Sequence, residues 1–275
     1  MTSPLSFTIA KHCSESGARL GRVETPHGGF DTPAFMPVGT RGTIRGLTPA
    51  QIAATGTQIL LNNAYHLMQR PGAEVVAEMG GVHRFMGWDK PILTDSGGYQ
   101  AYSMADINAV DDDGVTFKSV IDGSKIRLGP EQAIEVQNLL GPDIIMAFDD
   151  CPPAVDPVSL NEARRRMAAA RGGETVASDP RRLREANERT VRWLDRCVRA
   201  HARPSEQALF GIVQGGTDLD LRVESLEGVC NIELPGYAIG GVAVGEGSSE
   251  IDRVVEFTAP RLPADKPRYL MGIGY

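Results

Sequence analysis

Short apolar runs that end in polar or glycine-rich clusters recur along the chain. They are typical of short buried strands, and we predict seven strands, at 34–38, 58–61, 91–94, 143–148, 208–213, 236–239 and 268–271. Helical periodicity lies between most of them, at 72–79, 130–140, 183–200, 219–229 and 250–258. Thr48 and Pro49 mark a further helix start, as N-cap and first-turn residues. Strands that alternate with helices predict a parallel sheet in an α/β fold.

The polar and glycine clusters fall at the carboxyl ends of the predicted strands, where (β/α)8 barrels build their active sites. A strand pair at 7–10 and 19–23, followed by a turn at 25–29, predicts a β cap ahead of the barrel. A closed barrel of this type has eight strands, whereas seven are predicted here. We therefore expect a (β/α)8 TIM-type barrel with an N-terminal β cap, incomplete in this chain.

Composition indicates an ordinary globular chain. Its 275 residues are 41% hydrophobic and 23% charged, which suits one domain over 1–275, and the net charge of −7 gives no global basic field for nucleic acid. The four cysteines are scattered, so neither a zinc site nor a disulfide framework is readable. We expect a cytoplasmic protein, because no signal peptide and no run near the ~20 apolar residues of a membrane span is present.

The stretch after the third predicted strand is the first candidate site. Asp95 ends that strand, and Ser96, Gly97 and Gly98 follow it. A carboxylate at the carboxyl end of a buried strand, beside glycine backbone, is able to approach a ligand closely. The alternative is an Asp that caps the following turn, which is the better interpretation of an isolated Asp-Ser-Gly-Gly. The similar clusters at the other strand ends favour the site.

The segment from 160 to 203 is rich in arginine, with twelve Arg against six Asp or Glu. A solvated face of amphipathic helices is the commoner origin of such a run, and a phosphate-contacting patch is the functional alternative. Glycines at 172–173 and the Ser-Asp-Pro at 178–180 predict a loop between two helices.

Six motifs occur in an order that points to one family. They are Phe35-Met36-Pro37-Val38-Gly39-Thr40, Asn63-Ala64-Tyr65-His66-Leu67, Thr94-Asp95-Ser96-Gly97-Gly98-Tyr99-Gln100, Met146-Ala147-Phe148-Asp149-Asp150-Cys151, Gly211-Ile212-Val213-Gln214-Gly215-Gly216 and Gly240-Gly241-Val242-Ala243-Val244-Gly245-Glu246. From about residue 7 to 275 the chain resembles the tRNA-guanine transglycosylases (queuine tRNA-ribosyltransferases), the bacterial branch in particular. Any one motif would be weak evidence, but six in order are specific.

The resemblance implies a (β/α)8 barrel with an N-terminal β cap and a zinc-bearing insertion. It implies that guanine at the wobble position of tRNAs with a GUN anticodon is replaced by a 7-deazaguanine, through double displacement at the ribose C1′ and without a consumed cofactor. Two carboxylates suit this chemistry, one as nucleophile and one as proton donor and acceptor. The family also implies a homodimer. Val244 and Cys151 match the bacterial pattern, and a valine at the first position implies 7-aminomethyl-7-deazaguanine as the incoming base.

The resemblance also assigns residues. Asp95 matches the general acid/base, and Asp149 matches the carboxylate that accepts guanine N1–H and the exocyclic amine. Gln214 and the Gly241 N–H would donate to O6. The other positions of the base pocket are Ser96, Gly97, Gly98, Tyr99, Gly240 and Met271. The positions near the ribose or tRNA are Val38, Leu61, Asn63, Gly272, Ile273 and Gly274.

Each of these residues has a structural interpretation when it is taken alone. Asp149 would be a helix N-cap, and Tyr99 and Met271 would be core residues. His66 belongs to a motif but has no ligand partner at metal spacing, so we interpret it as a structural histidine. The order of the motifs makes us prefer the pocket role for Asp149.

Two features depart from the family pattern. The segment 160–184 looks longer than in the family, an arginine-rich insertion without an assigned role. The eighth strand, the nucleophilic Asp, the structural zinc ligands and much of the tRNA-binding surface of the family correspond to sequence beyond Tyr275, so we expect this chain alone to be inactive. A catalytically silent base-binding or partner subunit therefore stays open. An unrelated barrel glycosidase also stays open, although no second carboxylate of a sugar cleft is evident.

Overall fold

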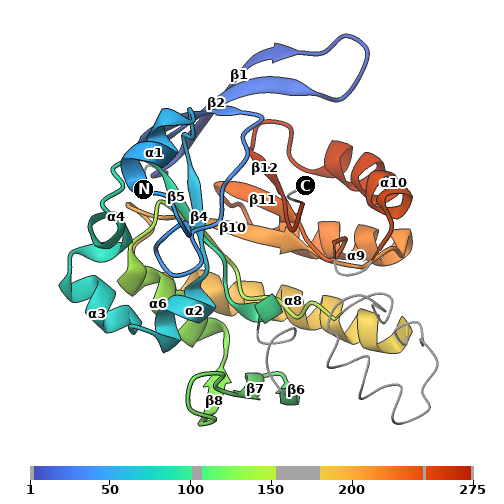
Figure 1. Ribbon diagram of the computed structural model, residues 1–275. Helices are drawn as coiled ribbons and strands as arrows, with labels where there is room; N and C mark the ends of the chain where they lie inside the picture. The colour runs from blue at the N-terminus through green and yellow to red at the C-terminus, as the bar shows by residue number, and fades with distance from the viewer. Residues whose placement is uncertain (1–2, 101–106, 153–179, 244–245, 274–275) are drawn as a thin grey trace.

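A parallel sheet forms the centre of the molecule. The computed structural model describes residues 3–100, 107–152, 180–243 and 246–273 (Figure 1). Six strands pair in the order β12-β11-β10-β9-β5-β4, each parallel to its neighbours. They are β4 (Leu60–Asn62), β5 (Ile92–Thr94), β9 (Ile144–Met146), β10 (Ala208–Val213), β11 (Gly236–Ile239) and β12 (Arg268–Leu270). Neighbouring strands follow chain order, as in a (β/α) barrel, and the sheet forms a parallel half-barrel.

The first strand predicted from the sequence is a single bridge rather than a strand. Val38 pairs with Leu61 in parallel, and the Gly39 N–H donates to the Leu61 carbonyl at 2.7 Å. Pro37 accepts from the Leu61 N–H at 3.1 Å but has no N–H of its own to extend the ladder. The segment 34–38 therefore lies beside β4 without forming a regular strand.

Helices cover the outer face of the half-barrel (Figure 1). They are α1 (Pro49–Ala54), α2 (Ala64–Gln69), α3 (Ala73–Glu78), α4 (Gly81–Met86), α6 (Pro130–Leu140), α8 (Pro180–Ala200), α9 (Leu219–Cys230), α10 (Ser248–Thr258) and the 3-10 turn η1 (Ala259–Arg261). The predicted start of α1 is confirmed, because Thr48 and Gln51 form a reciprocal capping box. None of the helices in the described ranges combines the length and the apolar character needed to span a membrane.

The core lies on both faces of the sheet. Ile145 and Leu209 pack outward with Trp193 of α8, whereas Met146 and Phe210 pack inward. Because successive side chains of a strand point to opposite faces, a continuous apolar run is buried on both sides. This is why the strands read as unbroken apolar stretches in the sequence.

The predicted N-terminal β cap is present as a three-stranded antiparallel sheet of β1 (Ser6–His12), β2 (Arg19–Thr25) and β3 (Gly28–Thr32). Val23 and Phe30 join the inward-facing core cluster, so the cap covers one end of the half-barrel. A second antiparallel sheet, of β6 (Ile107–Asp111), β7 (Gly114–Lys118) and β8 (Lys125–Leu128), lies between β5 and α6 and was not predicted.

Candidate active site

Four sequence-predicted residues meet at the carboxyl edge of the sheet. Asp95 follows β5, Asp149 follows β9, Gln214 follows β10 and Gly241 follows β11. Side-chain hydrogen bonds join Asp149 to Gln214 and to Ser96, the residue that follows Asp95. The Gln214 amide donates to Asp149 Oδ2 at 2.5 Å, and the Ser96 hydroxyl lies 3.4 Å from Asp149 Oδ1. The residues come from neighbouring strands, so the barrel topology itself assembles one polar cluster.

Asp149 is a buried carboxylate with few hydrogen bonds. Its residue is 5% exposed, and its side-chain donors among the described residues are Gln214 and the distant Ser96 hydroxyl. Burial raises the pKa of Asp149 to about 7, against the Gln214 hydrogen bond, and the negative charge of Asp150 raises it further. A buried carboxylate with spare acceptor capacity is suited to receive N–H donors from a ligand.

Asp95 is held more tightly. Its carboxylate accepts hydrogen bonds from the Asn63 amide, from the Ala64 backbone N–H at 2.9 Å and from the Gln100 amide at 2.9 Å. Burial raises the pKa of Asp95 to about 6 although these hydrogen bonds favour the charged form. A pKa close to neutrality suits a group that must both give and take a proton.

Close packing explains the glycines of the cluster. A Cβ on Gly98 would lie 2.8 Å from the Asp149 backbone carbonyl, and one on Gly240 would lie 2.8 Å from the Gln214 amide nitrogen. Gly241 has a φ of +63°, and its Cβ would meet Gln214 Oε1 at 2.3 Å. Side chains larger than hydrogen would therefore displace the polar groups beside them.

The other predicted positions lie around this cluster, with two outside the described residues. Leu61 and Asn63 are buried near the end of β4, and Val38 beside them is 49% exposed. Tyr99 and Met271 are half-buried, while Gly272 and Ile273 are exposed after β12. Gly97, with a φ of +82°, packs against Tyr65. The two outside the described residues are Gly274 and Val244.

His66 and Cys151 are buried to different degrees. His66 packs edge-on against Tyr65 at a ring distance of 5.2 Å, and burial together with the charge of Arg41 lowers its pKa. Cys151 is buried, and burial raises the pKa of its thiol well above the usual value, with Asp149 contributing. Neither residue belongs to a metal-binding group among the described residues.

Two residues that the sequence reasoning did not assign also belong to the site. Gln100 donates to Asp95, and Tyr269 of β12 lies near enough for the Asp95 charge to add to the effect of burial, which raises the Tyr269 pKa. The motif that contains Asp95 extends to Gln100 and was the available signal for it. Tyr269 sits inside a predicted strand, where a tyrosine reads as an ordinary core residue.

Most arginines in the described part of the arginine-rich segment, 180–203, form ion pairs. Asp150, fully buried beside Asp149, pairs with Arg182 at 2.7 Å and Arg189 at 2.5 Å. Exposed pairs of α8 and the following turn are Arg184–Glu224, Arg192–Asp112, Arg196–Glu131, Arg199–Asp195 and Arg203–Glu206. Within 180–203 the arginines named here thus pair with carboxylates, two of them with the buried Asp150. The predicted loop and the insertion at 160–179 lie outside the described residues.

A second polar cluster, a buried carboxylate with two histidines, lies at the opposite, amino ends of the strands. Asp143, just before β9, accepts from the His27 N–H at 3.1 Å and His27 Nδ1 at 2.8 Å on one oxygen. Its other oxygen accepts from His83 Nε2 at 3.0 Å and the Ile92 N–H at 2.9 Å. Among the described residues this is the trio close enough to share a cation. Both carboxylate oxygens are already fully hydrogen-bonded, which favours a structural network.

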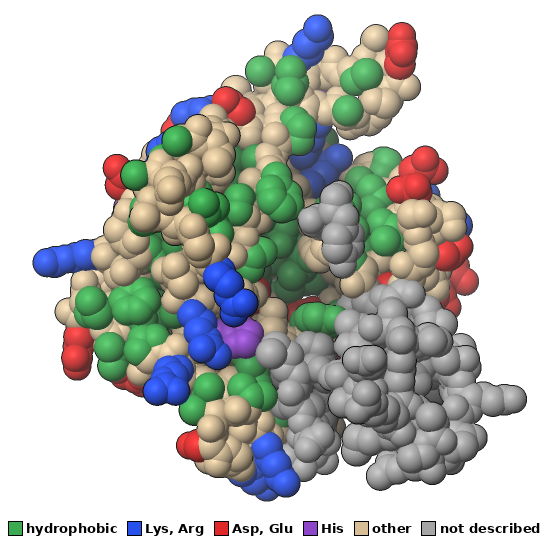
Figure 2. Space-filling model, viewed as in Figure 1, with side chains coloured by type: hydrophobic (Ala, Val, Ile, Leu, Met, Phe, Trp, Pro, Cys, Tyr) green, Lys and Arg blue, Asp and Glu red, His purple; other side chains and the backbone are tan. Residues whose placement is uncertain are grey.

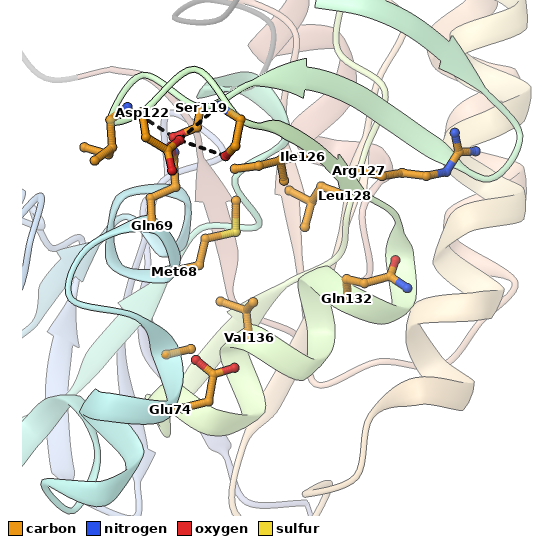
Figure 3. Close-up of a pocket in the computed structure, with 13 residues that line it drawn as sticks. Met68, Gln69, Glu74, Ser119, Asp122, Ile126, Arg127, Leu128, Gln132 and Val136 are labelled. Atoms are coloured by element: carbon orange, nitrogen blue, oxygen red, sulfur yellow. Dashed lines mark hydrogen bonds between the residues drawn. The ribbon is translucent and has the colours of Figure 1, made fainter.

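A cavity of about 360 Å³ opens elsewhere, between α2, α3, α6 and the β6–β7–β8 sheet (Figure 3). Met68, Ile126 and Val136 form apolar parts of its wall, while Glu74 and Gln132 add polar groups. It shares no residue with the cluster around Asp149.

Comparisons with known proteins place the chain in a family. The model of the family described as queuine tRNA-ribosyltransferase matches residues 13–171 and 173–275. The chain is 48% identical over 270 residues to the queuine tRNA-ribosyltransferase of Halalkalibacterium halodurans, covering 98% of this chain and 65% of that protein. It is 50% identical over 272 residues to the one of Acetivibrio thermocellus, covering 99% and 67%. It is also 50% identical over 268 residues to that of Synechococcus elongatus, covering 98% and 64%.

The matches extend over almost the whole chain, which spans roughly two-thirds of the length of these curated relatives, 64–67%. The parallel half-barrel and the polar cluster at its strand ends lie within the matched residues. The chain belongs to the queuine tRNA-ribosyltransferase family.

Proposed function

We propose that this chain binds guanine at Asp149 as the base pocket of a tRNA guanine-exchange enzyme. The reaction replaces guanine at the wobble position with 7-aminomethyl-7-deazaguanine through double displacement at C1′. The observation that carries the proposal is the buried, sparsely hydrogen-bonded carboxylate of Asp149 beside the Gln214 amide at 2.5 Å. Four carboxylates are buried among the described residues. Asp143 and Asp150 are fully occupied by donors or arginines, and Asp95 has three donors. Asp149 therefore has the greatest capacity for a ligand.

Guanine has the complementary edge. Its N1–H and exocyclic amine are adjacent donors, and one ionised carboxylate accepts both. The second N–H of the Gln214 amide and the backbone N–H of Gly241 would donate to O6. The same edge occurs in 7-aminomethyl-7-deazaguanine, so one pocket would hold the outgoing and the incoming base in turn. Tyr99 and Met271 would form the walls above and below the ring.

Asp95 would move the proton. The leaving guanine needs a proton when its glycosidic bond breaks, and the incoming base loses one when the new bond forms. A pKa of about 6 allows Asp95 to serve both steps near neutral pH, and the amides of Asn63 and Gln100 hold it in place. Val38, Leu61 and Asn63 would contact the ribose. We assign the nucleophile to no residue of the described chain.

The partners follow from the reaction. We propose tRNA with a GUN anticodon as the substrate in the cytoplasm, and a homodimer as the assembled state. Lys and Arg side chains that gather beside a histidine on one face support an RNA partner (Figure 2). The proposed exchange consumes no cofactor. The described residues hold no cysteine cluster that would bind the structural zinc of the family.

Calorimetric titration with guanine tests the pocket directly. We expect saturable binding of guanine and of 7-aminomethyl-7-deazaguanine, and no binding of adenine, which lacks the N1–H and exocyclic amine arrangement. Incorporation of labelled guanine into unmodified tRNA tests the exchange, with this chain alone and with this chain joined to the remaining C-terminal part of a relative. Equal affinity for adenine and guanine would contradict the pocket, and no incorporation by the extended protein would contradict the reaction.

Gly241→Ala should weaken guanine binding about tenfold or more, because its Cβ would overlap Gln214 Oε1 and its φ of +63° disfavours alanine. The same titration measures it. Gly17→Ala is the matched control, since a Cβ there has nothing within 4 Å, and its affinity should equal that of the unmodified chain. Unchanged affinity in Gly241→Ala would remove Gly241 from the pocket.

A further inference from the structure

Arg222 of α9 is a fully buried arginine with an unusual set of partners. Its residue is 0% exposed, and within the described part of the chain its guanidinium donates to backbone carbonyls alone. Nε and Nη2 donate to the Gly216 carbonyl at 2.9 and 2.8 Å, and Nη1 donates to that of Val213 at 3.0 Å. Nη2 also donates to the Gly241 carbonyl at 3.1 Å. One side chain thus joins the turn after β10 to the turn after β11.

These two turns are the ones that carry the proposed O6 donors. Val213 and Gly216 flank Gln214, and the third carbonyl belongs to Gly241 itself. Both turns are rich in glycine with positive φ, at +127° for Gly215 and +63° for Gly241. Glycine gives the backbone freedom at these points, so a unique conformation needs restraint from outside the turns.

The start of α9 fits closely against the first turn. A Cβ on Gly215 would lie 2.8 Å from the Arg222 backbone nitrogen. One helical turn further along α9, the Ser225 hydroxyl accepts the Gln214 N–H at 2.9 Å. Gln214 is therefore fixed on its backbone by Ser225, while the carbonyls on either side of it are fixed by Arg222.

We propose that Arg222 is a positioning residue of the base site, which holds the two glycine turns so that Gln214 and Gly241 face Asp149. This inference rests on the proposed function. A guanidinium suits the task because its five N–H donors form a rigid fork that reaches three carbonyls at once, whereas a lysine ammonium is a single point. Burial lowers the pKa of Arg222 to about 10, so the side chain keeps its charge at neutral pH.

Hydrogen exchange tests the restraint without any ligand. In Arg222→Met and Arg222→Lys we expect the backbone amides of Gln214 and Gly240 to exchange about tenfold faster or more. The Gly240 N–H is bonded to the Val213 carbonyl, which would lose its hydrogen bond from Arg222, and the Gln214 N–H lies in the same turn. The Leu60 amide, bonded to the Pro91 carbonyl at 3.1 Å on the far side of the sheet, should be unaffected. Acceleration at all three amides by the same factor, or at none, would overturn the proposal. If Arg222→Met does not fold, Arg222→Lys decides.

Arg253→Met is the matched control. Arg253 of α10 also donates to a carbonyl of the first turn, that of Thr217 at 2.7 Å, but its side chain is 44% exposed. Its removal takes away an arginine–carbonyl hydrogen bond where water is able to replace it. Exchange at Gln214 and Gly240 should therefore stay within about twofold of the unmodified chain.

The preference for guanine over 6-thioguanine tests whether Arg222 positions the O6 donors. 6-Thioguanine keeps the two donors for Asp149 but carries sulfur, a weak acceptor, in place of O6. Misplaced donors should weaken guanine binding about tenfold in Arg222→Lys and 6-thioguanine binding much less, so the preference for guanine falls. Equal weakening of both bases would indicate general loosening and contradict the positioning role. If the unmodified chain binds no guanine, the proposed function fails, while hydrogen exchange still decides whether Arg222 restrains the turns.

Discussion

Asp149→Asn should reduce guanine affinity by about a thousandfold, which corresponds to about 4 kcal/mol. The amide offers one acceptor where the carboxylate offers two, and its NH2 group would face the guanine N1–H or amine. Two charge-assisted hydrogen bonds are lost, and a buried donor is left facing another donor. Calorimetric titration of guanine measures the loss. Asp252→Asn, at an exposed position on α10, is the control and should bind like the unmodified chain.

The pH dependence of guanine affinity distinguishes direct binding by Asp149 from an effect of the substitution on folding. The pKa of Asp149 is raised to about 7 in the ligand-free protein, and guanine needs the ionised form. Below pH 7 the base must displace a proton, so affinity should fall by about tenfold per pH unit and proton release should accompany binding. Above pH 7 the affinity should be constant as far as Asp149 is concerned. Titrations in buffers of different ionisation enthalpy measure the released protons.

Asp149→Asn should show weak binding without this pH dependence or proton release. A variant that kept the full pH profile would place the titrating group elsewhere, with Asp95 as the next candidate because its pKa of about 6 is also raised.

The regular elements could largely be predicted from local signals. The strands at 208–213 and 236–239 agree with β10 and β11 because each is a continuous apolar run bounded by turn residues. The helix at 130–140 agrees with α6, since Pro130 and Gly141 mark its two ends. In contrast, α2 (Ala64–Gln69) is six residues long and has no side-chain cap, so little distinguishes it from a polar loop.

The contacts of the site could be predicted less well. Periodicity places Asp95, Asp149 and Gln214 at strand ends, but only the resemblance proposes what they bind. Arg222 lies in a helix, where a charged residue reads as solvent-exposed, and its acceptors at 213, 216 and 241 are backbone atoms without a sequence signal. Partners that are brought together by tertiary folding alone are invisible to a pattern along the chain.

The partners of Asp143 are likewise brought together by tertiary folding alone. Its four donors come from His27, His83 and Ile92, which lie far apart in the sequence. The network ties the turn before β3 to α4 and to the start of β5, and the two imidazole rings stack at 3.6 Å. Burial raises the pKa of Asp143. The hydrogen bond and charge of His83, and the hydrogen bonds from the Ile92 N–H and His27, outweigh burial and lower this pKa to about 2. This carboxylate therefore stabilises the fold in its charged form.

Asp143→Asn should lower the free energy of unfolding by about 2–4 kcal/mol. Each carboxylate oxygen accepts one backbone N–H, from His27 or from Ile92, so the amide NH2 of asparagine must face one of them. A histidine is able to change tautomer and accept from that amide, but a backbone N–H is not. One buried backbone donor is therefore left unpaired. Urea unfolding at neutral pH measures the difference, with Asp31→Asn on the exposed side of β3 as a control that should change little.

The difference between Asp143→Asn and the unmodified chain should also depend on pH. Since the Asp143 pKa is depressed from 3.8 to about 2 on folding, its contribution is complete above the unfolded value and is lost as pH falls through the folded one. The difference in unfolding free energy should narrow as the pH falls from about 4 to about 2. A difference that stayed constant down to pH 2, or an Asn variant as stable as the unmodified chain at pH 7, would show that the Asp143 charge does not stabilise this end of the barrel.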